Sequence, residues 1–243
     1  DAVYDKLIEV DLSAIKPLAA MPHSPDNVDS VAHIGPIKID QVAIGSCTNS
    51  SYTDLMKVAA ILKGKAVHPE VSLVISPGSS RIMAQMAENG ALADLIKAGA
   101  RVIENACGPC IGMGQSPKSG AVSLRTFNRN FKGRSGTNDA SVYLVSPETA
   151  AVSALYGVLT DGSTTGIALP HIDIAEAAPI ASFIVTPPAA PKAETPVEMG
   201  PNIKPFPRNT ALPDTITAQV TLKTGDNITT DDIMPSDSRL LPY

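Results

Sequence analysis

Several sequence features are scarce or absent in this chain of 243 residues, and each of these absences argues against a kind of core, a membrane span or a class of partner. Tryptophan is absent and aromatic residues make up only 4%, so the core must be built from Ala, Val, Ile and Leu. No apolar run reaches roughly 18 residues, so we expect no membrane-spanning helix and no membrane partner. The net charge is −5 and no basic tract occurs, which argues against a nucleic-acid partner.

The N-terminus and the cysteine count bear on the compartment. The first residues have neither the basic start nor the apolar stretch of a signal peptide, and they lack Met. We therefore expect the chain to begin inside a longer gene product. The three cysteines are an odd number, which argues against a disulfide framework. Together these features predict the cytoplasm or another reducing compartment, where thiolates can bind metal or react.

The middle of the chain alternates short apolar strands with amphipathic helices. This rhythm predicts an α/β fold, a three-layer sandwich with a mostly parallel sheet covered on both faces. Ser146 and Pro147 are typical of a helix start. The expected strands are 8–12, 41–45, 71–75, 101–103 and 142–145, and the expected helices are 52–63, 80–88, 91–98 and 147–155.

Composition divides the chain into three parts. We predict an α/β domain over 1–185 and a Pro-rich linker over 186–213, because proline fixes φ and removes hydrogen-bond donors. Residues 215–222 alternate as a strand does, so 214–243 should begin a β-rich second domain. About thirty residues are too few for a domain with its own core, so this part is interpreted as truncated.

The three cysteines follow predicted strands. Cys47 comes after strand 41–45, and Cys107 and Cys110 come after strand 101–103. Loops at the carboxyl ends of parallel strands meet at one edge of the sheet, where ligands bind. The two cysteine loops are therefore expected to meet.

Spacing alone leaves several uses for these thiols open. Structural zinc usually needs four ligands, and a thioredoxin-like Cys-x-x-Cys would leave Cys47 unexplained. An electron-transfer iron–sulfur protein normally uses four thiolates for each cluster. Three thiolates on a four-iron cluster would leave one iron open to act as a Lewis acid. Unrelated buried or redox-active thiols are the remaining alternative.

Four ordered segments resemble motifs of the aconitase family. They are Gly45–Ser50, Cys107–Gly112, Phe127–Arg134 and Val145–Ala150. The resemblance covers roughly residues 1–185 as the family's third α/β domain, and the tail around Asp231 looks like the opening of its fourth, swivelling domain. It implies a [4Fe-4S] cluster held by Cys47, Cys107 and Cys110.

The same resemblance implies an activity and further site residues. The parent protein is expected to be a lyase that dehydrates and rehydrates a citrate/isocitrate-type acid through cis-aconitate, as in the tricarboxylic acid cycle. Asn128, Arg129 and Arg134 match substrate-binding residues, and a planar guanidinium suits a carboxylate. Asp231 matches a catalytic aspartate.

Two departures keep a related substrate open. Asp232 replaces a histidine of familiar aconitases, and Arg134-Ser135-Gly136 is closer to isopropylmalate-isomerase-type relatives. An isopropylmalate- or homoaconitate-type isomerase is therefore the alternative within the family, beside an electron-transfer protein or a thiol-redox module. The expected partners are the acid substrate and the enzyme's remaining domains. Because these domains supply acid–base groups, we expect little or no turnover from the isolated chain.

Overall fold

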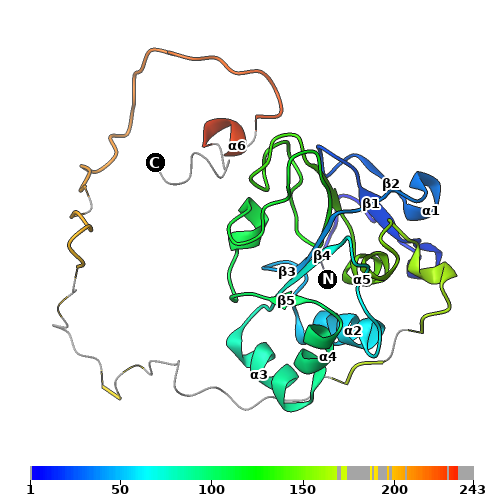
Figure 1. Cartoon of the computed structure of the whole chain (residues 1–243). Coiled ribbons are helices and arrows are strands. Elements are labelled where there is room, and N and C mark those ends of the chain that lie inside the picture. The colour runs from blue at the N-terminus through cyan, green and yellow to red at the C-terminus, as the bar shows by residue number, and fades with distance from the viewer. Residues whose placement is uncertain are drawn as a thin grey trace. The chain divides into compact units, whose positions relative to one another are not determined.

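The computed structural model describes residues 2–168, 171–173, 187, 189–190, 196, 199–205, 207–228 and 230–234. The chain divides into two units (Figure 1). The first is built on residues up to Ala178, and the second spans Pro179–Met234. The second unit contains the short helix α6 (Thr230–Ile233). The described residues contain no helix long and apolar enough to cross a membrane.

A seven-stranded sheet organises the first unit, in the order β2-β1-β7-β6-β3-β4-β5. The five strands from β7 to β5 are parallel, and β1 and β2 add an antiparallel edge. This confirms the α/β fold with a mostly parallel sheet. The strands are β1 (Leu18–Ala20), β2 (Val28–Ser30), β3 (Gln41–Gly45), β4 (Ser72–Ser76), β5 (Arg101–Val102), β6 (Val122–Arg125) and β7 (Ser141–Leu144).

The helices begin and end at residues that suit their positions. In α2 (Tyr52–Leu62), Ser51 and Asp54 form a reciprocal capping box. In α5 (Pro147–Tyr156), the Ser146 side chain caps the first turn and Gly157 ends the helix with φ 74°. The other helices of this unit are α1 (Val31–Ile34), α3 (Ser80–Glu88), α4 (Ala91–Lys97) and the 3₁₀ turns η1 (Leu12–Ala14), η2 (Gly108–Ile111) and η3 (Gly162–Thr164).

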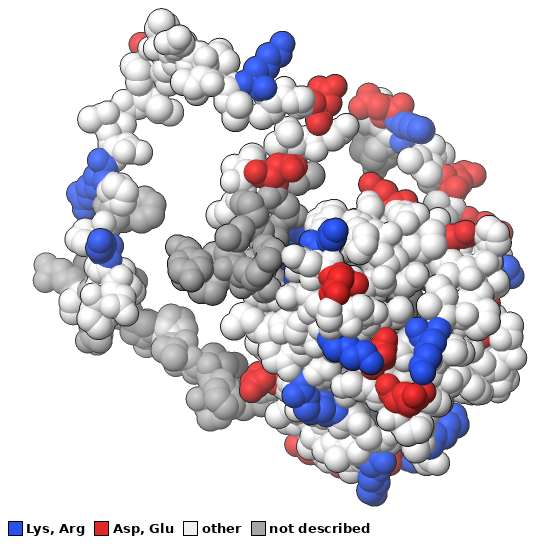
Figure 2. All heavy atoms as spheres, turned by 45° about the horizontal axis from the view of Figure 1, so that its top comes forward, with Lys and Arg blue, Asp and Glu red and all other residues white. Residues whose placement is uncertain are grey.

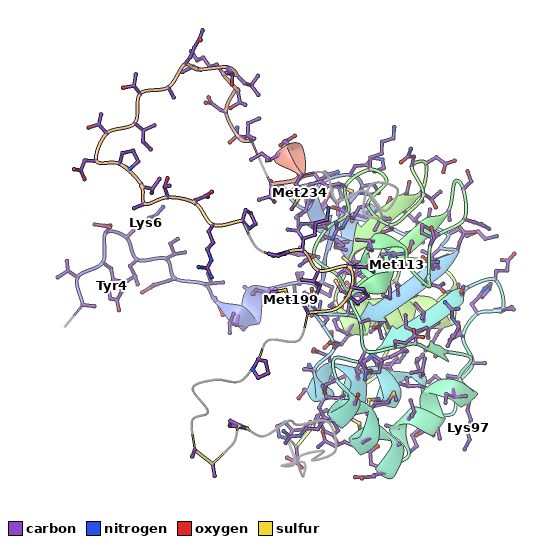
Figure 3. The ribbon with its side chains drawn as sticks, turned by 90° about the vertical axis from the view of Figure 1, so that its left-hand side faces the viewer. Tyr4, Lys6, Lys97, Met113, Met199 and Met234 are labelled. Atoms are coloured by element: carbon purple, nitrogen blue, oxygen red, sulfur yellow. The ribbon has the colours of Figure 1, made fainter. Side chains whose placement is uncertain are left out.

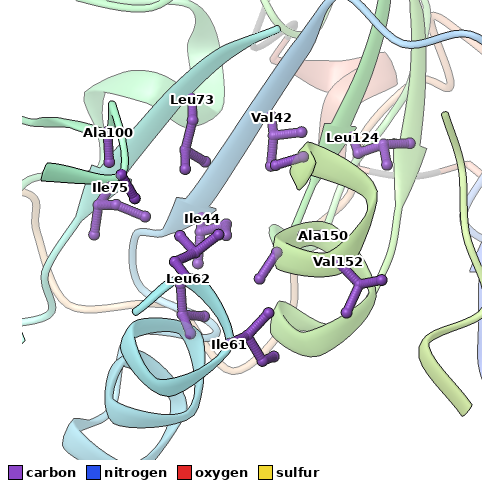
Figure 4. Close-up of a cluster of buried hydrophobic side chains, with 14 of the residues drawn as sticks. Val42, Ile44, Ile61, Leu62, Leu73, Ile75, Ala100, Leu124, Ala150 and Val152 are labelled. Atoms are coloured by element: carbon purple, nitrogen blue, oxygen red, sulfur yellow. The ribbon is translucent and has the colours of Figure 1, made fainter. Parts of the chain in front are cut away.

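One face of the sheet is apolar and packs against helices. Side chains from β3, β4 and β6 point toward α2 and α5, as Figure 4 shows. Aliphatic residues fill this layer, as the lack of aromatics predicted. The fully or nearly buried residues at its centre are Val42, Ile44, Leu73, Ile75 and Leu124 from the strands, and Ile61, Leu62, Ala150 and Val152 from the helices.

The opposite face is different in character, and we refer to it as the loop-covered face. Strand alternation and the parallel register place Gln41, Ala43, Val74, Ser123 and Arg125 on it. A small apolar cluster of Ala43, Val74, Cys110 and Phe127 lies here. η2 and its loop therefore pack on this face and bring Cys110 onto the sheet.

Two strands expected from the sequence are not formed. Residues 8–10 have no regular structure, and η1 begins at Leu12. The segment has no neighbouring strand, and Leu7 and Ile8 are exposed, so an alternating pattern alone cannot make a strand there. Tyr4, which precedes this segment, lies away from the sheet in Figure 3. Residues 215–222 also lack strand structure. In the predicted linker, the described residues 187, 189–190, 196, 199–205 and 207–213 form neither helix nor strand.

Candidate functional site

Loops from four parallel strands gather at one edge of the sheet. They follow β3, β4, β5 and β6, and all leave the carboxyl ends of their strands. The Ser76 hydroxyl at the end of β4 donates to Glu104 O at 3.0 Å and to Ala106 O at 3.2 Å. The loop that carries Cys107 is therefore tied to its neighbouring strand, at the edge where parallel sheets bind ligands.

A tight turn places Cys47 directly after β3. Gly45 has φ 115°, and a Cβ atom there would lie 1.9 Å from Ser76 O. The Gly45 N–H donates to Thr126 Oγ1 at 2.9 Å, and the Ser46 N–H donates to Ser76 O at 3.0 Å. Ser46 is buried and has φ 63°, a conformation that is uncommon outside glycine. The backbone at Cys47 is thus fixed by contacts to β4 and to the loop after β6.

The second cysteine loop is built around η2. The Cys110 N–H donates to Cys107 O at 3.1 Å, which sets the separation of these two residues. Cys110 is buried and Cys107 is exposed. Gly112 has φ 86°, and a Cβ atom there would lie 2.3 Å from Ser135 O. The close approach at Gly112 packs the cysteine loop against the loop that contains Arg134.

The three thiols lie close enough to affect one another. The Ser46 hydroxyl is 4.0 Å from Cys107 Sγ. Burial raises the pKa of the Cys107 thiol, and the neighbouring Cys110 and Cys47 sulfurs raise it further, because like charges repel. The Thr48 hydroxyl holds the pKa of Cys47 below its usual range, with help from Ser46 and Cys107. The predicted meeting of the two cysteine loops is therefore present in the structure.

The chemistry of the donor set is compatible with an iron–sulfur cluster. Within the described residues, no three His, Cys, Asp or Glu side chains are arranged to hold one metal ion. A four-iron cluster has a different requirement. Each thiolate binds a different iron, so the cysteine sulfurs lie further apart than the ligands of a single ion do. Three soft thiols from two loops, with the buried cation Arg134 beside Cys110, are compatible with such an anionic group.

The loop after β6 carries the predicted substrate-binding residues. Arg134 is buried, and its Nη2 donates to Cys110 Sγ at 3.6 Å. Arg129 is half-buried and Asn128 is exposed. Asn130, which the sequence analysis did not single out, is fully buried and donates to Met21 O at 2.8 Å and to Val142 O at 3.2 Å. Asn130 thereby anchors the arginine-bearing loop to the antiparallel edge of the sheet.

Asp231 lies in the other unit of the chain. It is part of α6, and its side chain is outside the described residues. Its role as a catalytic aspartate stays a prediction, as do the roles of Asn128, Arg129 and Arg134 in substrate binding.

A buried polar group beneath Cys110 also escaped the sequence analysis. Gln41, Ser123 and Arg125 are buried on the loop-covered face and hydrogen-bond to one another. The signal available was weak, because Val122-Ser123-Leu124-Arg125 alternates like a strand with one exposed face. From the sequence alone, an arginine at the end of such a strand is expected to face solvent. Only the structure shows that a loop covers it.

Charged side chains outside this edge show no single-sign area on the face drawn in Figure 2, where basic and acidic residues are intermixed.

The comparisons with known proteins point to one family. The family model for "Aconitase family (aconitate hydratase)" matches residues 29–157. The chain is 50% identical over 159 residues to the 3-isopropylmalate dehydratase large subunit of Moorella thermoacetica. These residues are 65% of this chain and 38% of that protein. It is 47% identical over 163 residues to the protein of the same name from Clostridium botulinum, covering 66% of this chain and 39% of that protein.

A relative with a different name is almost as similar. The homoaconitase large subunit of Thermus thermophilus is 44% identical over 161 residues, which cover 66% of this chain and 38% of that protein. The match thus spans about two fifths of the length of each of these relatives.

Proposed function

This chain belongs to the aconitase family, and on that premise we propose that it is the cluster-binding part of a hydro-lyase, with Cys47, Cys107 and Cys110 holding a [4Fe-4S] cluster. The proposal is supported by the contact between the two cysteine loops, in which the Ser46 hydroxyl lies 4.0 Å from Cys107 Sγ, and by Arg134, which donates to Cys110 Sγ at 3.6 Å. Such a cluster supplies an open iron that acts as a Lewis acid toward a hydroxyl group.

The protein's own residues have separate tasks in this proposal. The turn at Gly45 and Ser46 and the 3₁₀ turn at Cys110 fix the ligand sulfurs, because both are held by backbone contacts to neighbouring loops. Arg129 and Arg134 bind substrate carboxylates, whose burial without a cation would be costly. Asn128 orients the substrate by hydrogen bonding, and Asp231 acts as a catalytic aspartate.

The names of the relatives favour one substrate type. We infer a hydroxy acid of the isopropylmalate or homoaconitate type, ahead of the citrate/isocitrate pair that the sequence suggested first. The relatives are called large subunits, so we propose that the remaining site residues come from other parts of a longer protein or from another subunit. The division at 1–185, 186–213 and 214–243 belongs to the same proposal.

Anaerobic reconstitution of the full chain with Fe²⁺ and sulfide tests the cluster. We expect about four irons for each chain and the broad visible absorbance of a cluster, both lost in Cys47→Ala, Cys107→Ala and Cys110→Ala. Met113→Leu is the matched control, because Met113 is an exposed sulfur residue of the same loop (Figure 3). Full iron content in all three cysteine variants would contradict the proposal, and a reversible Cys107–Cys110 disulfide without iron would favour a thiol-redox module.

The substrate assignment needs the assembled enzyme. In it, Arg134→Ala should lower kcat/KM at least about a hundredfold, and Arg134→Lys should recover only part, because an ammonium cannot bind a carboxylate in a bidentate way. Assays on isopropylmalate, homocitrate-type acids and citrate then rank the substrates. Near-normal turnover of all of them by Arg134→Ala would exclude this role for Arg134.

A further inference from the structure

Arg125 is a fully buried cation at the end of β6, on the loop-covered face of the sheet. Its Nε donates to Ser123 Oγ at 3.1 Å, and its Nη2 donates to Gln41 Oε1 at 2.9 Å and to Gln115 O at 2.9 Å. Its Nη1 donates to Pro109 O. The guanidinium carbon also lies 5.4 Å from the centre of the Phe127 ring. The side chain is therefore held in one position by four hydrogen bonds.

These hydrogen bonds bracket Cys110. Pro109 directly precedes Cys110, and Gln115 lies five residues after it, so one guanidinium holds the carbonyl groups on both sides of the ligand segment. Gln41 extends the same network, since its Nε2 donates to Ser116 O at 3.1 Å while its Oε1 accepts from Ser123 Oγ at 2.8 Å. The segment 109–116 is thus held by hydrogen bonds to side chains of β3 and β6 in the sheet on which it packs.

The charge of Arg125 is not balanced by these partners. All four acceptors that bind it are neutral oxygens, and no ion pair with a carboxylate is found for it within the described residues. Burying a cation without an anion is costly. Burial lowers the pKa of Arg125 to about 10, and the sulfur of Cys110 acts in the opposite direction. The guanidinium is still protonated at neutral pH, and Cys110 is one of its neighbours.

We infer that Arg125 is a positioning residue for Cys110: it fixes both sides of the 109–115 segment and supplies a buried positive charge facing the anionic group that the cysteines hold. The charge part of this inference rests on the proposed cluster, and the fixing part does not. Nothing in the family match or in the relatives' names assigns Arg125 a role. Arg134 approaches Cys110 as well, and because it is proposed to bind substrate, Arg125 is left as the cation committed to the protein itself.

Amide hydrogen exchange of the metal-free full chain tests the fixing role. Arg125→Met keeps an unbranched aliphatic stem and removes the guanidinium with its four hydrogen bonds, so exchange over 109–116 should be about tenfold faster or more, while the β3–β4 core stays protected. Arg101→Met is the matched control, because exposed Arg101 donates to Gly114 O in the same loop at 2.5 Å but from the solvent side. We expect at most a small change in that variant.

The stability of the whole chain separates positioning from a merely structural role. Arg125→Met removes a buried, unbalanced charge but leaves four acceptors without their donor, so the two effects oppose each other and the urea midpoint of the metal-free variant should change little. A lower midpoint with exchange raised uniformly across the sheet would overturn the inference. If Arg125→Met does not fold, Arg125→Lys serves instead. Lysine keeps the charge but cannot make the hydrogen bonds to the carbonyl groups on both sides of Cys110. Exchange of the 109–116 loop equal to that of wild type would then overturn the inference.

The charge role is tested after reconstitution with Fe²⁺ and sulfide. The cluster of Arg125→Met should have a more negative reduction potential than wild type, because removing a nearby cation disfavours adding an electron. Arg125→Lys should stay near the wild-type potential, and Arg101→Met should not change it. An unchanged potential in Arg125→Met would overturn the charge role. Absence of a cluster in the wild-type chain would instead count against the proposed function and leave the exchange result intact.

Discussion

The two faces of the sheet in the first unit follow different rules, although they share the same strands. One face buries aliphatic side chains against α2 and α5 with regular packing. The loop-covered face buries the polar network of Gln41, Ser123 and Arg125 under the irregular loop that carries Cys110. The first face stabilises the fold through apolar burial, and the second fixes the shape of the site through directional hydrogen bonds. Variants that affect one face and spare the other test this division.

The largest effect on stability is expected on the helix-covered face. Ile44→Ala removes a fully buried side chain between β3 and the helices, and should lower the free energy of unfolding by about 2–5 kcal/mol. Urea denaturation of the metal-free chain measures this. The folded fraction should still take up iron normally, because Ile44 points away from the cysteines. The control Ile96→Ala, at a residue 55% exposed in α4, should cost far less.

The next largest loss of stability is expected at the end of β3. Gly45→Ala would place a Cβ atom 1.9 Å from Ser76 O, so the backbone must shift, at a cost of about 1–3 kcal/mol. The shift displaces Cys47, and we expect iron uptake to fall together with stability. Gly64→Ala is the control, since Gly64 also has positive φ, at 70°, but nothing lies within 4 Å of a Cβ there. Equal losses in both variants would mean that backbone strain alone explains Gly45.

A smaller, pH-dependent effect is expected between the two helices. Glu148 Oε1 of α5 and Lys57 Nζ of α2 are 3.0 Å apart and half-buried. Burial opposes the ionisation of Glu148, but its own backbone N–H and the Lys57 ammonium hold the pKa of this carboxyl below its ordinary value. A depressed folded-state pKa adds stability above the unfolded value, and this stability is lost as pH falls through the folded value.

Glu148→Gln should therefore lower stability by about 0.5–1 kcal/mol near pH 7, and the difference from wild type should vanish below about pH 4. Urea midpoints measured across this range give the result. Glu70→Gln is the control, because the Lys38–Glu70 pair is exposed on both sides, and solvent screens it. A difference that persists unchanged in acid would mean that lost packing, not charge, is responsible.

The smallest effect is expected in the N-terminal segment, which belongs to neither face. Leu7 and Ile8 are 78% and 71% exposed, so Leu7→Ser and Ile8→Ser should change the stability of this chain by no more than about 0.5 kcal/mol. Thermal denaturation checks this. A loss as large as that of Ile44→Ala would show that the segment contributes to the core.

The elements that the sequence predicted well are those whose own residues specify them. The Ser146 cap, the Pro147 start and the apolar spacing of α2 and α5 give the helix bounds within a residue or two. The strands β3, β4 and β7 are short, largely apolar runs in the sequence that also stand out. The segments 8–12 and 215–222 have an equally good strand pattern, yet neither forms a strand, because a ladder needs a neighbour that the pattern cannot supply.

The candidate site divides in the same way. The family, and the cysteines and arginines proposed for the site, were within reach of the sequence, because motifs and the rule that ligands bind at strand ends apply to residue types and order. The burial of Arg125, the bracket around Cys110, the contact of Arg134 with Cys110 and the anchoring by Asn130 were decided by the tertiary structure alone. Each depends on which loop covers which face of the sheet, and that is settled by packing between segments far apart in the chain, which no local pattern encodes.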